Sequence, residues 1–481
     1  MTQPGVRLTK IDGAMGVLPP TAGRMPAYVG ACSSGPLNVP ATFSRVKDIV
    51  GTFGSGPLVE SAAAFIDRWS RPVTLVRTDS GDGALGTLTH QKTGTSVVTA
   101  DGEPLDDYDL VLWFTIGGTV GTPGIQYRLS WDGGVNFERA QQLGSATTIT
   151  AGGVVFHLAA GTVVAGDTHS ISATAPQWDD TDLSDALGAL GQSRIAWELL
   201  NVVGPMSPST FDLVDAKITA MEEAGKPRGW IGHVRMPTIG ETHAAYQTAL
   251  TSPWAGKATL TGSLCAGDGQ FVSGVNGRSY RRPLMFPYAA LTAGLSEEAN
   301  AADVNIGQLK NFSITDTNGT PTAHDESLFP GLDDLRFVTA RTWGDDIQGV
   351  YVNRARIFAP TGSDFQIMPR VRVMALARIA LNAYFTRRLN KPILVSESTG
   401  FILETEALEI EAGARAAMVA KVISGTRKAS AVQFKLSRTD PVLSELTLTG
   451  DARVVGLAYP EQVNLTLGYY NPALQIQKVA A

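Results

Sequence analysis

The chain has 481 residues, of which 43% are hydrophobic and 17% are charged, and this predicts a globular protein of about three domains. A net charge of −6 without a block of basic residues argues against a nucleic-acid-binding surface. The two cysteines, Cys32 and Cys265, supply neither a disulfide framework nor a metal cluster, which fits a reducing cytosol. We find no signal peptide and no apolar run of about 20 residues, so we expect no membrane insertion.

Residues 1–22 have the pattern of an extended arm. Val6 and Leu8 alternate with polar residues, which predicts a strand, whereas Pro4 and Pro19 exclude a helix. A strand that stands apart from a core has unpaired backbone groups and needs a partner. The arm can fold back onto a sheet of its own chain or pair with a neighbouring subunit.

Residues 23–82 are expected to form the first part of an α/β body. The spacing of apolar residues predicts a strand over Met25–Gly30, a helix over Leu58–Trp69 and a buried strand over Val73–Arg77. The three elements make a compact β-α-β unit.

Residues 83–177 carry almost no helix signal. Ile125, Tyr127 and Leu129 alternate with polar residues, and the pattern returns over Val154–Leu158. Strands at this spacing predict a small antiparallel β-domain. Because it lies between two α/β stretches, we interpret it as an insertion at the periphery of the body.

Residues 178–345 return to alternating strands and helices, which predicts a parallel or mixed sheet covered by helices. The helix expected over Asp180–Gln192 has Thr181 or Asp182 as its candidate N-cap. The other expected elements are the strands Trp197–Val203, Gly229–Met236 and Lys257–Cys265 and the helices Ser209–Gly225, Glu241–Thr251 and Pro283–Ser296.

Residues 346–455 contain the strongest helix pattern of the chain, over Ile367–Leu389. A second helix is expected over Glu404–Val422, with glutamates in its early turns, where the helix dipole favours acids. Strands are expected over Asp346–Ile357, Val432–Arg438, Ser444–Gly450 and Ala452–Ala458.

Residues 456–481 have the pattern of a second arm. Val463, Leu465 and Leu467 alternate with polar residues, which predicts a half-buried strand. The fold class expected for the whole chain is therefore a multidomain α/β (α+β) protein. It has a mixed sheet with flanking helices in the body, an inserted antiparallel β-domain, and extended N- and C-terminal β-arms.

The sequence offers no specific reason to propose catalysis. The run Gly51-x-x-Gly54-x-Gly56 lacks the Gly-Lys-Ser/Thr of a phosphate-binding loop and predicts a structural turn. None of the six histidines forms a zinc-type pair, and His233 is expected to be a core or rim residue. We therefore expect no cofactor and no metal. The alternative is an α/β enzyme with a catalytic domain near residues 195–270 and an accessory β-domain.

Six short stretches of the chain carry a family resemblance when taken together: Gly35–Pro40, Phe53–Pro57, Gly349–Asn353, Ala359–Phe365, Arg370–Met374 and Tyr459–Val463. Together they resemble the contractile tail sheath proteins of bacteriophages and of related contractile injection systems. The resemblance covers most of the chain and is a pattern of several segments rather than one decisive motif.

The resemblance implies a structural subunit of a contractile sheath. In that family, subunits pack as stacked hexameric rings around an inner tube, and both arms add strands to sheets of adjacent subunits. Contraction from a metastable extended state drives the tube through a bacterial envelope. The implied partners are other sheath subunits, the tail tube protein, the baseplate and the tail terminator. The implied location is a virion tail or an injection particle, assembled in the bacterial host cytoplasm.

The resemblance also implies roles for particular residues. The arm strands would carry Val6, Leu8, Val463, Leu465 and Leu467, and the arm hinges would be Gly13, Gly16, Gly23 and Gly456. Residues 83–177 would face outward and residues 346–455 would lie near the tube. Two helices remain candidates for the tube contact: Ile367–Leu389, with Arg378 and Asn382, and Glu404–Val422, with Glu404 and Glu409.

Overall fold

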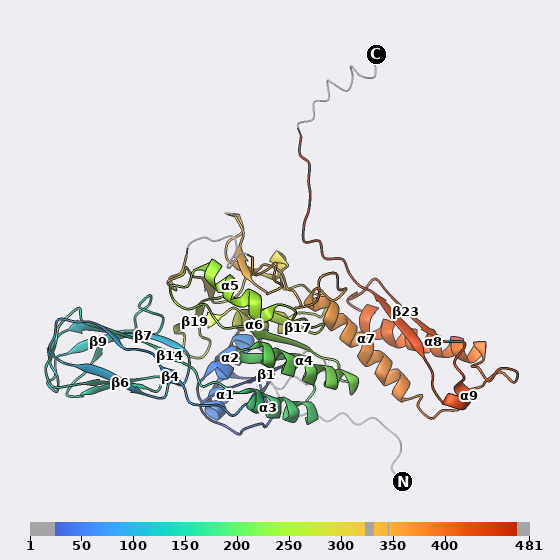
Figure 1. Ribbon diagram of the computed structural model, residues 1–481, viewed down its shortest axis with the longest axis horizontal. Helices are drawn as coiled ribbons and strands as arrows, with labels where there is room; N and C mark the ends of the chain where they lie inside the picture. Colours follow the sequence, from blue (N-terminus) through green and yellow to red (C-terminus); the bar gives the residue numbers. More distant parts are fainter. Residues whose placement is uncertain (1–24, 323–330, 345, 469–481) are drawn as a thin grey trace, which may run out of the picture.

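A computed structural model of the protein describes residues 25–322, 331–344 and 346–468. Figure 1 shows three parts in a row: a β-rich part at one end, an α/β body in the middle, and a smaller lobe at the other end. The predicted N-terminal arm strand and its hinges lie outside the described residues; these are Val6, Leu8, Gly13, Gly16 and Gly23.

The body is built on a six-stranded sheet in the order β17-β16-β15-β1-β3-β2. Its strands are β1 (Pro26–Gly30), β2 (Ala41–Phe43), β3 (Val73–Arg77), β15 (Leu199–Pro205), β16 (Gly229–His233) and β17 (Gly262–Cys265). Only β2 runs antiparallel to its neighbour. β1 and β16 are buried along their whole length, as strands covered on both faces are. The mixed α/β body expected from the sequence is confirmed.

The helices of the body are α1 (Val46–Phe53), α2 (Pro57–Trp69), α3 (Asp180–Gln192), α4 (Pro208–Glu223), α5 (His243–Trp254) and α6 (Met285–Gly294). The predicted N-cap of α3 was wrong. Asp179 is the cap, because its carboxylate accepts hydrogen bonds from the backbone N–H groups of Thr181 and Asp182. The Asp182 side chain completes a capping box by accepting from the backbone of Asp179.

Residues 84–174 form antiparallel sheets around a hydrophobic core of their own. The strands are β4 (Ala84–Leu85), β5 (Thr89–Gln91), β6 (Val98–Gly102), β7 (Tyr108–Ile116), β8 (Gly118–Thr119), β9 (Gln126–Ser130), β10 (Gln141–Gln142), β11 (Thr148–Ala151), β12 (Val154–Leu158), β13 (Thr162–Val163) and β14 (Thr168–Thr174). Leu112, Phe114 and Phe156 are fully buried in this core. Tyr280 of the body packs into the same core and joins the two parts.

Shorter strands complete the body. They are β18 (Asp268–Val272), β19 (Ser279–Pro283), β20 (Phe312–Ile314), β21 (Ala340–Thr342) and β22 (Val350–Val352), with a 3₁₀ turn at Val304–Ile306. The strand pair or single long strand expected over Asp346–Ile357 is reduced to one short strand, Val350–Val352, which pairs with β21.

The lobe consists of α7 (Met368–Thr386), α8 (Glu404–Met418) with its π-helical continuation Val419–Ile423, β23 (Ala431–Leu436), α9 (Val442–Glu445) and β24 (Gly450–Val455). The strand expected over Ser444–Gly450 is wrong, because Pro441 precedes a helical turn there. The core changes within α7: Met368 and Val371 pack in the body, whereas Val373 and Ala377 pack in the lobe. The expected start of a separate domain at residue 346 therefore does not coincide with a change of core.

Candidate functional site

The C-terminal segment, described over residues 456–468, contacts the body near its root. The Tyr459 hydroxyl donates a hydrogen bond of 2.8 Å to the Glu298 carbonyl, and Glu461 lies 3.4 Å from the Arg354 guanidinium. Beyond this root, Val463, Leu465 and Leu467 are 70%, 87% and 99% exposed. No strand is assigned to residues 462–468, so the predicted half-buried strand does not form within the described chain.

The same lobe carries a sheet of only two strands, β23 and β24. β23 packs against α8 through Val432 and Leu436, whereas almost every residue of β24 is exposed. Among the described residues, no third strand pairs with this sheet. On the β23 side, the Leu436 backbone N–H already donates to the Glu411 carboxylate, so the exposed strand β24 is the edge that a strand from another chain could extend.

The proposed hinge Gly456 lies directly after β24. Its carbonyl accepts a hydrogen bond of 3.3 Å from the Ser430 hydroxyl, and the anchors Tyr459 and Glu461 follow it in the chain. The first described residue past these anchors is therefore Gln462, six positions after the expected hinge Gly456.

The two candidate residues on α7 face the body. Arg378 forms an ion pair with Glu222 of α4, and the Asn382 amide donates a hydrogen bond of 3.4 Å to the Gly225 carbonyl. α7 therefore contacts the body through Arg378 and Asn382.

The two candidate residues on α8 are exposed but paired within the lobe. Glu404 binds Arg438 at 2.6 Å, and Glu409 binds Arg388 at 2.7 Å. The hydrogen bond from Arg438 lowers the pKa of the Glu404 carboxyl. Leu408 lies on the outer face of the same helix and is 52% exposed, so α8 offers a mixed apolar and charged surface.

Buried ion pairs fix the three parts to one another. Arg282 binds Glu60 at 2.6 Å and Asp106 at 3.1 Å, which ties the body to the β-rich part. Arg372 of α7 binds Glu198 at 2.7 Å and donates to carbonyls at the end of α6, which ties the lobe to the body. Sequence reasoning missed both arginines. The sequence indicates such a buried arginine only where a charged residue interrupts apolar neighbours, as in Val371-Arg372-Val373.

The glycine run, Cys32 and His233 have structural environments. Gly54 and Gly56 adopt positive φ angles of 69° and 133° between α1 and α2, so the glycine run is the predicted turn. Burial raises the pKa of the Cys32 thiol to about 11 and lowers the pKa of His233 to about 4. Within the described ranges, no group of three His, Cys, Asp or Glu residues could hold a metal ion. No helix in that part of the chain is long and apolar enough to span a membrane.

The fold of this chain is similar to that of solved proteins from contractile systems. A chain of the anti-feeding prophage (AFP) baseplate superposes with a TM-score of 0.52 at 9% identity, over 98% of this chain and 100% of the other. The PVC sheath of an extracellular contractile injection system, in its contracted state, gives a TM-score of 0.50 at 10% identity, over 97% and 98%. A sheath tail protein from Listeria innocua gives 0.43 at 12% identity, over 93% and 98%. The chain has the fold of contractile sheath proteins, as the resemblance in its sequence predicted.

The chain belongs to the DUF2586 family, whose N-terminal domain matches residues 3–356. No curated protein matches the sequence.

Proposed function

We propose that the protein is a structural subunit of a contractile sheath. Its copies would form stacked hexameric rings around an inner tube and contract from a metastable extended lattice, without a catalytic step. The sheath fold supports this proposal. The single observation that carries it is the C-terminal segment, which exposes three alternating apolar side chains a few residues beyond the exposed strand β24 of a two-stranded sheet.

The segment would add a strand to the sheet of a neighbouring copy. Burying Val463, Leu465 and Leu467 would contribute about 1.5–3 kcal/mol for each side chain. Ordering the backbone costs about 1–2 kcal/mol for each residue, so this burial alone does not exceed the cost of ordering the segment. Pairing would therefore depend on backbone hydrogen bonds and on the other contacts of a lattice, which makes assembly cooperative.

The lobe would lie near the tube and the β-rich part of residues 84–174 would face outward. Of the two candidate helices, we favour α8 as the tube-facing one. Arg378 and Asn382 of α7 contact the body, whereas Leu408 of α8 is exposed on the outer face.

The partners in this proposal are neighbouring sheath subunits, a tail tube protein, a baseplate and a tail terminator, with no nucleic acid and no membrane insertion. The particle would be a virion tail or an injection particle assembled in the cytoplasm of a bacterial host, and contraction would drive its tube through an envelope. No observation on the described residues favours the alternative of an α/β enzyme.

Negative-stain electron microscopy of the purified chain tests the proposal. We expect hollow striated tubes, alone or after addition of the cognate tube protein. Replacing Val463, Leu465 and Leu467 together by serine should abolish these tubes. The matched control replaces Gln462, Asn464 and Thr466 by serine on the other face of the segment and should leave them intact. Small uniform particles in every case, even with the tube protein, would contradict the sheath function.

A further inference from the structure

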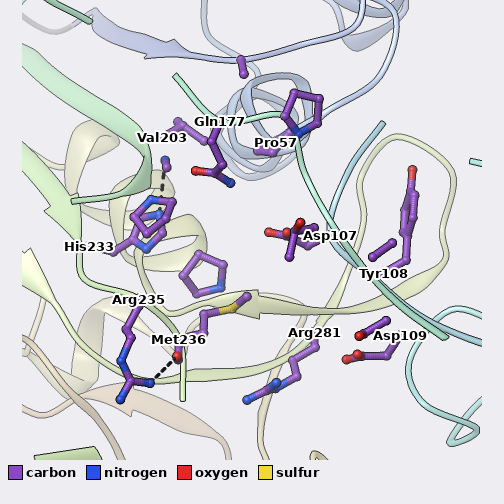
Figure 2. Close-up of a pocket in the computed structure, with 18 of the residues that line it drawn as sticks. Pro57, Asp107, Tyr108, Asp109, Gln177, Val203, His233, Arg235, Met236 and Arg281 are labelled. Carbon is purple, nitrogen blue, oxygen red and sulfur yellow. Dashed lines mark hydrogen bonds between the residues drawn. The ribbon is translucent and has the colours of Figure 1, made fainter. Parts of the chain in front are cut away.

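A cavity of about 430 Å³ lies where the body meets the β-rich part. The ends of β15 and β16 line one side of it with Val203 and His233, and the start of β7 lines another with Asp107 and Asp109. Figure 2 shows the two aspartates projecting from the side opposite His233 and Arg235.

The cavity occupies a characteristic position in the sheet. β1 pairs with β3 on one side and with β15 on the other. Further strands continue the sheet on both sides, β2 beyond β3, and β16 and β17 beyond β15. Such a reversal of strand order opens a crevice at the carboxyl ends of the strands, where open α/β sheets bind ligands. Ala31, which follows β1, and Val203–Pro205 at the end of β15 line the cavity, so it lies at this reversal.

The charge that remains uncompensated in the cavity wall is negative. Arg235 is neutralised by Glu241, whose two oxygens it contacts at 2.8 and 2.7 Å, and Arg281 forms an ion pair with Asp268. The Asp109 carboxylate has no hydrogen bond or ion pair with any residue that the structure describes. Burial raises the pKa of Asp109, the nearby Arg281 and Arg282 lower it, and the neighbouring Asp107 and Asp132 raise it.

His233 adds no positive charge, although it lines the cavity. Its Nε2 accepts a hydrogen bond of 3.2 Å from the Gly204 backbone, and its Nδ1 lies 2.9 Å from the Val234 carbonyl. Both ring nitrogens are therefore used within the fold, and the ring is neutral because burial lowers its pKa to about 4.

We propose that this cavity binds a small organic cation with an apolar body. The ammonium or guanidinium group would contact the Asp109 carboxylate, and the apolar body would lie among Trp178, Met236 and Phe286, which also line the cavity. Asp107 lies on the same side of the cavity; its Oδ1 accepts a hydrogen bond of 2.7 Å from the Ala175 backbone N–H, so its other carboxylate oxygen would be the second acceptor.

Three compounds that share a benzene ring and differ in charge test this proposal: benzylammonium, benzyl alcohol and benzoate. Each is titrated into the full chain at neutral pH and followed by calorimetry. We expect benzylammonium to bind about tenfold more tightly than benzyl alcohol or better, since a charge-assisted hydrogen bond forms only with the cation. Asp109→Asn should remove this preference, whereas Asp101→Asn, an exposed carboxylate on β6, should retain it.

Acidification provides a test that needs no variant. As the pH falls through the pKa of Asp109, the carboxylate is protonated and the preference for benzylammonium over benzyl alcohol should disappear. Tighter binding of benzoate, an unchanged preference in a folded Asp109→Asn protein, or no binding of the cation at millimolar concentration would each overturn the proposal.

Discussion

The β-rich part and the C-terminal segment are both peripheral, but they use the same sequence pattern in opposite ways. Strand β12 alternates so that Val154, Phe156 and Leu158 are buried between two layers of its own sheets. Val463, Leu465 and Leu467 alternate with the same period and lie in solvent. The period of two predicts which residues share a face, but it does not say which chain supplies the layer that covers them.

The two regions also differ in how they are attached. Arg282 of the body binds Glu60, which is also in the body, and Asp106 of the β-rich part, and these two carboxylates are 7% and 4% exposed. The C-terminal segment depends on the partly exposed contacts of Tyr459 and Glu461. We infer that the first region moves with the body and that the second is free to pair elsewhere.

Arg282→Met should produce the largest loss of stability. It leaves Glu60 and Asp106 buried without their common partner, and breaking a buried pair in this way costs about 3–5 kcal/mol in the free energy of unfolding. Urea denaturation measures the loss, with Arg453→Met on the exposed strand β24 as the control. Equal stability of Arg282→Met and Arg453→Met would contradict the claim that Arg282 attaches the β-rich part firmly to the body.

Leu112→Ala should cost about 2–5 kcal/mol, because it removes a fully buried side chain from the core of the β-rich part. Hydrogen exchange should show the loss first in residues 84–174, and later in the lobe. A uniform loss over the whole chain would mean that the β-rich part has no stability of its own.

Acidification should stabilise the junction between the body and the β-rich part through Asp268. Burial raises the pKa of this carboxyl from 3.8 to about 6 despite the nearby Arg281. The folded state therefore binds the proton more tightly than the unfolded state, and its stability falls as the pH rises from about 4 to 6, by at most about 3 kcal/mol. The difference in unfolding free energy between wild type and Asp268→Asn, followed over this range, should show that slope. A difference in unfolding free energy that does not change with pH would contradict this prediction.

Serine at Val463, Leu465 and Leu467 together should have the smallest effect on the isolated chain. Because these side chains are exposed, we expect a change within about 0.5 kcal/mol in the free energy of unfolding. Thermal denaturation of the unassembled protein measures it. A loss of several kcal/mol would show that the segment folds back onto its own chain.

Local patterns were sufficient for much of the fold. The predicted helices over Leu58–Trp69 and Asp180–Gln192 match α2 and α3, because each has one apolar face and a defined end. The predicted strand over Ser444–Gly450 failed where α9 and an exposed loop replace it. Short elements with few buried residues carry too little periodicity to be assigned.

Contacts between distant residues could not be predicted. Arg282 and Glu60 are 222 positions apart, and Arg372 and Glu198 are 174 apart, so no local pattern indicates either pair. For the same reason, the helix pattern over Ile367–Leu389 did not reveal that Arg378 contacts α4. The apolar alternation of the C-terminal segment, in contrast, was visible in the sequence because it depends on neighbouring positions only, although the half-buried strand predicted from it does not form among the described residues.

Hydrogen exchange of the backbone amides of residues 462–468 tests the central claim most directly, by comparing the unassembled chain with assembled tubes. Pairing with a neighbouring copy predicts fast exchange in the free chain and strong protection, alternating along the segment, in the tubes. Fast exchange in both states would contradict strand donation by this segment and, with it, the proposed basis of assembly.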